Sequence, residues 1–271
     1  MSLVMKRIAI LTAAALLGGC AVSQQQEVQM GQQYSAEISQ QLPLINDPVA
    51  NRYINVLGDS IARLTSRGDL DWHFYIVNSP EVNAFAVPGG FVYVNRGLIE
   101  RADKMDELAG VLGHEIGHVV RRHTVKQMQQ QQGANLGVTL ACILTSVCNN
   151  QATGTAIQVG GSALFAKFSR SDEAQADEEG VKNTIRAHIS PEGIVTMFQK
   201  LIQERKSQPA AVDGWFATHP MEEDRIAEVQ RMISAYPPGA LSGLTKDSQN
   251  FHAFKTRLAS LPAPPPQRTG R

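Results

Sequence analysis

The sequence predicts an α+β fold that is mostly helical and contains one small β-sheet. Apolar residues recur at helical spacing over residues 24–67 and again from about 103 to 132, which predicts two long helical regions. Between them, three short segments rich in Val, Phe and Tyr predict strands at Phe74–Val77, Val82–Val87 and Phe91–Val94. The chain has 271 residues, 43% of them hydrophobic, and is long enough to bury the core of one domain.

Proline and glycine mark the limits of these elements. Pro43 and the pair Asp47-Pro48 separate a Gln-rich first helix from a second helix that ends near Gly68. Asn-Ser-Pro and Pro-Gly-Gly sequences between the strands predict turns. Asp103 is the expected cap of the next helix, and acidic residues in the first turn favour its dipole. We expect this helix to continue to about residue 132 without a break.

The most informative motif lies in this helix, in the run His114-Glu115-Ile116-Gly117-His118. Residues four apart share a helix face, so both imidazoles can reach one metal ion. Glu115 is rotated by about 100° and lies beside the open coordination position, where a carboxylate can accept a proton from water. This spacing of two histidines and a glutamate is typical of zinc hydrolases.

A metal site of this kind needs a third protein donor. His123 is nearest, but in a continuous helix it lies about 140° around from His118, and we interpret it as a surface or cap histidine. The segment 169–177 predicts another helix, with Glu173 and Asp177 on one face. Glu173 would complete a site of two histidines and one glutamate, and Asp177 could accept the outward N–H of a ligand imidazole. The alternative is that these carboxylates form a solvated acidic face.

Four blocks of this sequence together resemble a known family. They are Asn83–Gly90, Glu107–His118, Ser169–Asp177, and Thr218-His219-Pro220 followed by Arg225-Ile226. They are similar to the zinc metalloendopeptidases related to the heat-shock protease HtpX and the CAAX prenyl protease, in the soluble periplasmic lipoprotein branch that includes BepA and LoiP, with LoiP the nearer. The resemblance implies a zincin domain of the gluzincin type, one zinc ion per chain, and peptide hydrolysis.

The same resemblance places His219 and Arg225 at the site. We expect His219 to stabilise the oxyanion of the reaction, with Arg225 orienting it or sharing the charge, because both are donors when protonated. The sequence Thr-His-Pro is also typical of a helix start, with Pro220 at the first position. As a free imidazole, His219 could instead occupy the open metal position and hold the enzyme latent.

Substrate binding is assigned by the resemblance to the strand that contains Asn83, Ala84, Phe85 and Ala86. In this fold an edge strand beside the metal-binding helix pairs with an extended substrate backbone. The expected substrates are therefore unfolded or misassembled proteins of the cell envelope. The alternatives are an ordinary edge strand, a chaperone or assembly factor for outer-membrane proteins that mainly binds in the cleft, and a structural lipoprotein with an incidental zinc.

The N-terminus has the pattern of an export signal. Lys6 and Arg7 precede the short apolar run Ile8–Leu17, which is too short to span a bilayer. The run Leu-Gly-Gly-Cys ending at Cys20 resembles a bacterial lipobox, in which the cysteine is acylated, and Ala21 is typical of lipoproteins sent to the outer membrane. We expect a lipid-anchored protein that faces the periplasm of a Gram-negative bacterium. The alternative is an ordinary signal peptide with an incidental cysteine.

Charge and cysteine content narrow the class further. Lys plus Arg and Asp plus Glu both number 25, so nothing in the charge balance favours nucleic acid as a partner. Cys142 and Cys148 form an even pair in a chain predicted to enter an oxidising compartment, which favours a disulfide. Six residues of helix would separate their Cα atoms by about 9 Å, so a bridge requires a turn. Two buried free thiols are the alternative.

The remaining segments complete the predicted organisation. Residues 133–168 are an apolar, Gly- and Ala-rich helical hairpin that could lean on the membrane or on a partner. Helices are expected at 190–206 and 220–235, followed by a tail that starts at Pro237 and ends in the Pro-rich run 262–266.

The predicted domains are a signal peptide at 1–19, a metallopeptidase domain at 20–236 and a C-terminal tail at 237–271. Expected partners are the protein substrates, the outer membrane reached through the lipid anchor, and other envelope proteases or the outer-membrane assembly machinery.

Overall fold

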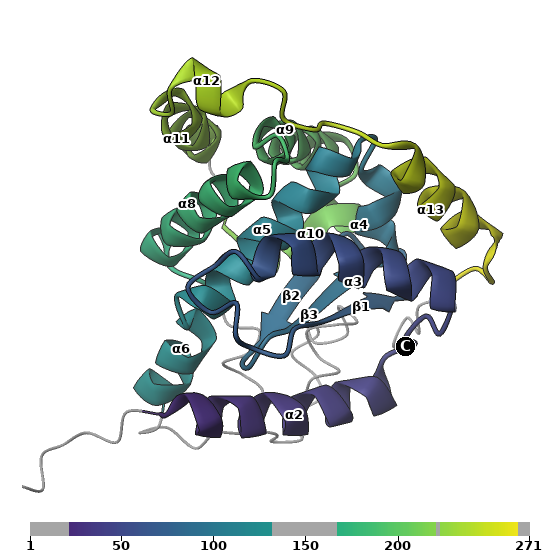
Figure 1. Cartoon of the computed structure of the whole chain (residues 1–271). Helices are drawn as coiled ribbons and strands as arrows, with labels where there is room; N and C mark the ends of the chain where they lie inside the picture. The colour runs from purple at the N-terminus through teal and green to yellow at the C-terminus, as the bar shows by residue number, and fades with distance from the viewer. Residues whose placement is uncertain (1–21, 132–166, 221–222, 265–271) are drawn as a thin grey trace, which may run out of the picture.

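A computed structural model describes residues 22–131, 167–220 and 223–264, and it confirms a mostly helical α+β fold with one small sheet (Figure 1). The helices are α2 (Gln24–Gln41), α3 (Pro48–Ala62), α4 (Arg96–Arg101), α5 (Met105–Val120), α6 (His123–Gln131), α8 (Arg170–Arg186), α9 (Glu192–Ser207), α10 (Pro209–Thr218), α11 (Glu223–Ser234), α12 (Pro238–Leu241) and α13 (Gln249–Ser260). Among the described helices, none is both long enough and apolar enough to cross a bilayer.

The sheet has three strands in the order β1-β3-β2. β1 (His73–Val77) pairs in parallel with β3 (Phe91–Asn95), and β2 (Ala84–Val87) pairs with β3 in the antiparallel direction. Gly89 and Gly90 form the turn between β2 and β3 with φ values of 85° and 102°, a region that glycine enters without strain. β2 is therefore an edge strand of this sheet, as the sequence predicts.

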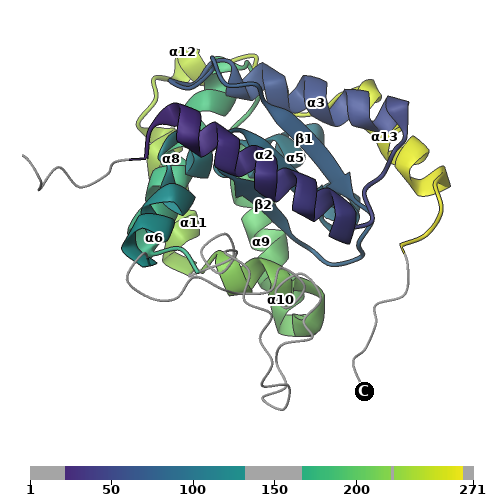
Figure 2. The ribbon, with the colours of Figure 1, turned by 90° about the horizontal axis from the view of Figure 1, so that it is seen from below.

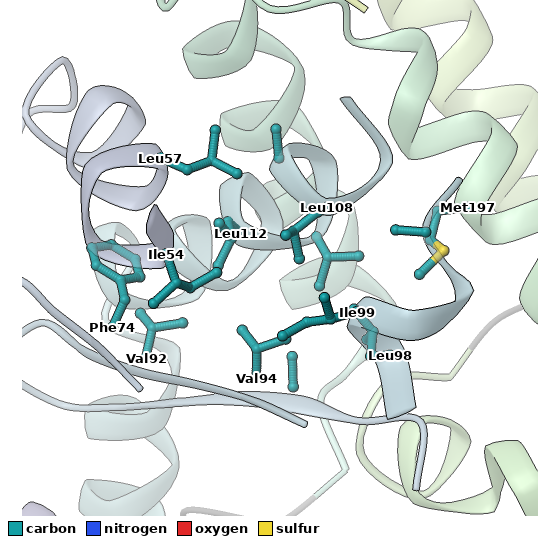
Figure 3. Packing of buried hydrophobic residues seen from close by; sticks show 14 of the residues in the cluster. Ile54, Leu57, Phe74, Val92, Val94, Leu98, Ile99, Leu108, Leu112 and Met197 are labelled. Carbon is teal, nitrogen blue, oxygen red and sulfur yellow. The ribbon is translucent and has the colours of Figure 1, made fainter. Parts of the chain in front are cut away.

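One face of the sheet packs on the main core of the protein. Side chains alternate along a strand, so Val92 and Val94 of β3 point to the same face and meet residues of α3 and α5, among them Ile54 and Leu112 (Figure 3). Leu98 of α4 extends this cluster. The core thus packs α5, the helix that carries His114 and His118, against α3 and the sheet.

The other face of the sheet is covered by α2, which lies across the strands (Figure 2). Ile38 of α2 packs against Phe85 and Tyr93, and the Tyr93 hydroxyl is 2.8 Å from Ser35 Oγ. The strands are consequently apolar on both faces. This accounts for their nearly continuous runs of Val, Phe and Tyr.

A buried carboxylate ties α2 to the rest of the domain. Glu27 is fully buried and accepts from Arg67 through Oε1 and from Arg122 through Oε2, each at 2.7 Å. Arg67 also donates to the carbonyl oxygen of Val119, near the end of α5, at 2.9 Å. The start of α2 is therefore connected to the C-terminal end of the metal-binding helix.

The backbones of α5 and α8 approach each other closely. An added Cβ at Gly117 would lie 2.7 Å from the carbonyl oxygen of Ala176, and one at Gly113 would lie 3.3 Å from the Cα of Gly180. Such distances are shorter than ordinary van der Waals contact, so a side chain at Gly117 would push the helices apart. The glycines thus allow the histidines of α5 to meet the carboxylates of α8.

The expectation of one continuous helix from Asp103 to about residue 132 was wrong in its cap and in its continuity, although helical structure does extend to Gln131. The helix begins at Met105 with Lys104 at the cap position, while Glu107 Oε2 accepts from the Asp103 amide at 2.6 Å. It ends at Val120, and a new helix starts at His123. Arg122 between them has a φ of 59°, in the left-handed region where a continuous helix cannot pass.

We had expected the segment after Pro237 to be only a tail, but it contains a helix that packs on the core. Phe251, Phe254 and Leu258 recur at helical spacing, and α13 buries all three against the core. Arg257 of the same helix pairs with Asp47 at 2.6 Å. The folded core therefore extends beyond residue 236.

The other predicted helices have close counterparts in α9 and α11, whereas α4 and α10 were not predicted. The signal peptide, Cys20, the Cys142–Cys148 pair and residues 133–166 of the predicted hairpin lie outside the described residues.

Candidate metal centre

Four buried side chains converge at the junction of α5, α8 and α10. His114, His118, Glu173 and His219 each offer one donor atom, and these atoms lie within 4.8 Å of one another. The two Nε2 atoms of His114 and His118 are 3.0 Å apart because the residues sit one helical turn apart on the same face of α5. The structure thus brings together the three metal donors that the sequence predicts and His219, which the family resemblance placed at the site.

The contribution of α8 comes from its first turns. Ser169 caps this helix and forms a capping box with Asp172, which fixes where the helix starts. Glu173 then points into the cluster, with Oε1 at 3.4 Å from His118 Nε2 and Oε2 at 3.6 Å from His114 Nε2. The carboxylate faces both imidazoles.

His219 enters the cluster from the end of α10. It is the C-cap of that helix, and its amide donates to the Trp215 carbonyl at 2.8 Å. Its Nδ1 is 3.3 Å from His114 Nε2 and 3.1 Å from Glu173 Oε1, and its ring stacks on Trp215 with centroids 4.5 Å apart. His219 therefore ends one helix, and the next described helix, α11, begins only at Glu223.

The donor set fits a zinc ion. Ligands about 2.0–2.1 Å from zinc in a tetrahedron are separated by about 3.4 Å, close to the distances between these donors. Two imidazole nitrogens that face each other at 3.0 Å inside the protein also need a proton or a cation between them. His219 Nε2 and Glu115 Oε1 are buried without a hydrogen-bond partner, so polar atoms at this centre are not fully satisfied by the protein.

Glu115 lies beside the cluster and outside the donor set. Its side chain is buried, and Oε1 is 3.4 Å from His219 Nε2. Burial raises the pKa of Glu115, although the neighbouring imidazoles of His219 and His114 oppose this effect. A carboxyl group with a raised pKa is suited to accepting and releasing a proton.

Asp177 and Arg225 form the outer wall of the centre. Asp177 Oδ1 is 2.8 Å from His114 Nδ1, the ring nitrogen that faces away from the cluster. Arg225 donates to both oxygens of Asp177, to Glu173 and to the Pro220 carbonyl, and its guanidinium lies 4.6 Å from the ring centroid of Phe198. The hydrogen bonds of Arg225 are thus with the two carboxylates of α8 and the Pro220 carbonyl, and its expected role in orienting His219 or sharing the oxyanion charge stays a prediction.

The charges of the buried groups depend on one another. Burial alone would raise the pKa of Glu173, but His219 and His118 hold it well below its usual range. Burial would lower the pKa of His219, but Glu173 and Glu115 outweigh this effect and raise it. Burial lowers the pKa of His118 well below its usual range. The centre therefore favours an ionised Glu173 and a neutral His118, the states in which these residues bind metals.

His123 is not a surface or cap histidine, and that interpretation was wrong. Its side chain is only 1% exposed, and its Nδ1 lies 3.0 Å from Nδ1 of His118. The helix break at Arg122 returns the chain toward the cluster, so the angle expected for a continuous helix does not apply. Phe168, which the sequence analysis did not single out, stacks on His118 with centroids 3.9 Å apart. No local pattern in the sequence signals either contact.

The edge strand runs beside the metal-binding helix. The Asn95 amide donates to the Asn83 carbonyl at 2.9 Å, and Phe85 pairs with Tyr93 two residues later. Hydrogen-bonded pairs alternate in an antiparallel ladder, so the peptide groups of Ala84 and Ala86 point away from β3. The side chains of Asn83, Ala84, Phe85 and Ala86 are all buried.

Comparisons with known sequences identify metalloproteases as relatives of this chain. The chain is 32% identical over 254 residues to the beta-barrel assembly-enhancing protease of Escherichia coli O157:H7. The aligned region covers 90% of this chain and 50% of that protein. It is 28% identical to the metalloprotease LoiP of Escherichia coli K12 over 163 residues, 60% of this chain and 63% of LoiP. The mitochondrial metalloendopeptidase OMA1 of Schizosaccharomyces pombe is 26% identical over 181 residues, 67% of this chain and 52% of OMA1.

These matches refine the expected relationship. The similarity to the assembly-enhancing protease is longer and higher in identity than that to LoiP, although the sequence had suggested that LoiP stands nearer. The chain spans about half the length of the assembly-enhancing proteases that it matches.

The model of peptidase family M48 matches residues 48–233, which include β1 to β3 and all four converging side chains. The chain therefore belongs to peptidase family M48.

Proposed function

We propose that this protein is a zinc-dependent endopeptidase that cleaves unfolded or misassembled proteins of the cell envelope. The observation that carries the proposal is the convergence of His114, His118 and Glu173 in a buried cluster, with Glu115 beside it. Membership of peptidase family M48 supports the same chemistry. The named metalloprotease relatives support it as well.

The proposed mechanism divides the work among these residues. A zinc ion held by His114, His118 and Glu173 would supply Lewis acidity that polarises a water molecule and a peptide carbonyl. Glu115 accepts the proton of the attacking water and passes it to the leaving amine. Asp177 accepts the Nδ1–H of His114 and so holds that ring with Nε2 toward the cluster.

His219 has two candidate roles in this scheme. As a donor it would stabilise the oxyanion that forms on the substrate carbonyl. As a fourth ligand it would hold the enzyme latent, and this role is supported by its Nδ1, which lies 3.3 Å from His114 Nε2 and 3.1 Å from Glu173 Oε1. Peptidase activity of His219→Ala separates the two roles, because loss of an oxyanion donor lowers the rate whereas removal of a blocking ligand raises it.

The edge strand β2 is the proposed binding site for the substrate backbone. The peptide groups of Ala84 and Ala86 point away from β3, the direction in which an extended chain would pair with this strand. An unfolded protein offers an extended segment for such pairing more readily than a folded one. This is why we propose unfolded or misassembled proteins as substrates.

The proposed location rests on the sequence. We propose that residues 1–19 are a signal peptide, that Cys20 is acylated, and that the enzyme faces the periplasm from the outer membrane.

We also propose a disulfide between Cys142 and Cys148. Thiol labelling of the exported protein, denatured without reductant, tests it, and two reactive thiols would refute it. The metallopeptidase domain is proposed to start at Cys20, and its core includes α13 in addition to the range up to residue 236 that we had expected.

Digestion of casein tests the enzymatic proposal directly. Purified protein should degrade casein, a chelator should abolish the activity, and added zinc should restore it. Glu115→Gln should bind zinc but lose proteolysis, because an amide of nearly the same shape cannot accept the proton. Glu178→Gln, on an exposed position of α8, is the matched control and should retain activity. Activity of Glu115→Gln within a few fold of the unmodified protein would refute the role of Glu115.

A second candidate function is assembly of outer-membrane proteins by binding rather than by cleavage. It is favoured by the name of the relatives that match 90% of the chain, beta-barrel assembly-enhancing protease. In cells that depend on this protein, Glu115→Ala should then retain full function. Loss of function in the same variant would favour the protease.

A further inference from the structure

The two candidate histidine ligands of α5 have different outer partners. The Nδ1 of His114 meets a carboxylate, Asp177 Oδ1, at 2.8 Å. The Nδ1 of His118 meets another imidazole nitrogen, Nδ1 of His123, at 3.0 Å. A carboxylate can only accept a hydrogen from an imidazole N–H, whereas a second imidazole can either donate or accept. The direction of the hydrogen bond at His118 must therefore be set by something beyond the pair.

The first constraint comes from the metal side. His118 Nε2 points into the cluster, 3.0 Å from His114 Nε2 and 3.4 Å from Glu173 Oε1. To bind a metal this nitrogen needs a free lone pair, so a neutral His118 carries its proton on Nδ1. His118 must then donate, and Nδ1 of His123 must accept.

The second constraint comes from the far side of His123. Its Nε2 lies 3.3 Å from Gln175 Oε1 and 3.5 Å from Asp172 Oδ1, and both of these atoms are acceptors. The amide nitrogen of Gln175 donates to Ser171 Oγ at 3.2 Å, which leaves the amide oxygen facing His123. Both neighbours therefore favour a proton on Nε2 of His123 and a lone pair on its Nδ1.

We propose that His123 is a positioning residue for the metal centre: it accepts the Nδ1–H of His118 and thereby fixes the tautomer and ring orientation that direct His118 Nε2 to the metal. The hydrogen bonds run in one direction from His118 to His123, from His123 to Gln175 and from Gln175 to Ser171. His123 is not one of the four residues whose donor atoms converge at the centre.

The backbone places His123 for this role. Arg122 adopts a left-handed conformation, with a φ of 59°, and α6 starts at the next residue. The turn is held by Arg122, which donates to Glu27 Oε2 at 2.7 Å and to the Val22 carbonyl oxygen at 2.5 Å. His123 is thus fixed by contacts outside the metal cluster, as a residue that orients a ligand should be.

Zinc affinity of two variants at this position tests the inference. His123→Leu removes the acceptor, whereas His123→Asn keeps an amide oxygen near the place of Nδ1. Competition of the full exported chain with a chromophoric chelator should show zinc binding weakened by about 10–100-fold in His123→Leu and by less than about 3-fold in His123→Asn. His252→Leu, which removes an exposed histidine, should leave the affinity unchanged.

Two results would overturn the proposal. One is a His123→Leu variant that binds zinc as tightly as the unmodified protein, and the other is an equal loss in both His123 variants, which would indicate packing rather than hydrogen bonding. The inference rests on the proposed metal site, which the unmodified protein tests separately. Failure of that protein to bind zinc would refute both, whereas normal binding with an unaffected His123→Leu would refute this inference alone.

A measurement without mutation covers the case in which His123→Leu does not fold. Nitrogen-15 NMR of histidine side chains in the zinc-loaded protein distinguishes protonated from bare ring nitrogens. We expect a proton on Nδ1 of His118 and, in His123, a proton on Nε2 with a bare Nδ1. A proton on Nδ1 of His123 would reverse the hydrogen bond and overturn the assignment.

Discussion

Arg225 binds both oxygens of Asp177, with Nε to Oδ2 and a terminal nitrogen to Oδ1, each at 2.8 Å. The planar guanidinium matches the carboxylate in this two-point contact, and a lysine ammonium cannot reproduce it. Since Asp177 in turn faces His114 Nδ1, the arginine of α11 determines how a carboxylate of α8 meets a histidine of α5. Burial opposes ionisation of Asp177, but Arg225 and His114 lower its pKa and keep it charged.

Removal of this arginine should therefore destabilise the protein strongly. Arg225→Leu leaves the carboxylates of Asp177 and Glu173 buried without their cation, and we expect a loss of about 3–5 kcal/mol in the free energy of unfolding. Denaturant unfolding of the metal-free protein measures it. Arg231→Leu on the same helix, where the side chain is 71% exposed, should change stability by less than about 0.5 kcal/mol. Equal losses in the two variants would contradict this interpretation of Arg225.

Replacement of a metal ligand should weaken zinc binding more than replacement of a residue that only orients a ligand. Glu173→Ala removes one of three proposed protein ligands and should abolish stoichiometric zinc binding. Asp177→Asn keeps an acceptor oxygen near His114 and should weaken zinc by about 10–100-fold at most. Metal analysis after dialysis, with competition titration for the weaker variant, distinguishes them. Stoichiometric zinc at unmodified affinity in Glu173→Ala would rule this residue out as a ligand.

The contact between α5 and α8 should not tolerate a side chain at Gly117. The added methyl group of Gly117→Ala would lie 2.7 Å from the Ala176 carbonyl oxygen and 2.9 Å from its Cα, so one backbone must move. We expect a loss of about 1–3 kcal/mol together with weaker zinc binding. Thermal unfolding measures the stability of this variant. Gly239→Ala is the control, and its melting temperature should hardly change because nothing lies within 4 Å of the added Cβ.

Asp106 should make stability depend on pH. Burial, with a smaller contribution from Glu107, raises the pKa of this carboxyl group to about 6. A pKa raised on folding favours the native state at low pH, and this contribution is lost as the pH rises from about 4, the unfolded value, through about 6.

Asp106→Asn should consequently be more stable than the unmodified protein at pH 8, by about 1 kcal/mol after allowance for screening by solvent. The difference should disappear below about pH 4. Thermal unfolding at both pH values provides the measurement. A variant less stable than the unmodified protein at pH 8 would show that ionised Asp106 is favourable at the start of α5.

Acylation of Cys20 should determine membrane attachment without affecting the metal centre. Cys20→Ser is expected to convert a protein that requires detergent for extraction into a soluble or unprocessed one. Zinc binding should be unchanged, because Cys20 lies more than 90 residues before His114, the first proposed ligand in the sequence. Cell fractionation tests the location. If the variant still partitions wholly with outer membranes, another segment holds it there, and residues 133–168 would be the next to examine.

The sequence by itself determined the features that depend on local geometry. Two histidines four residues apart share one face of any α-helix, so His114 and His118 point together wherever that helix lies. The same holds for Glu173 and Asp177 on α8 and for the strands on either side of the Gly89-Gly90 turn. The fold class followed because these elements are set by periodicity and turn residues within a few positions of each other.

Only the tertiary structure decided where distant segments meet. Residues 121–123 contain neither a glycine nor a proline to mark a helix end, and the left-handed conformation of Arg122 is unfavourable by about 1–2 kcal/mol on its own. Its ion pair with the buried Glu27, which lies on a different helix, compensates for this and turns His123 onto His118. In the same way, the spacing of Phe251, Phe254 and Leu258 is typical of a helix, but the core surface on which α13 packs is built by other segments. Such contacts gain their free energy from burial between distant residues, and no local pattern encodes them.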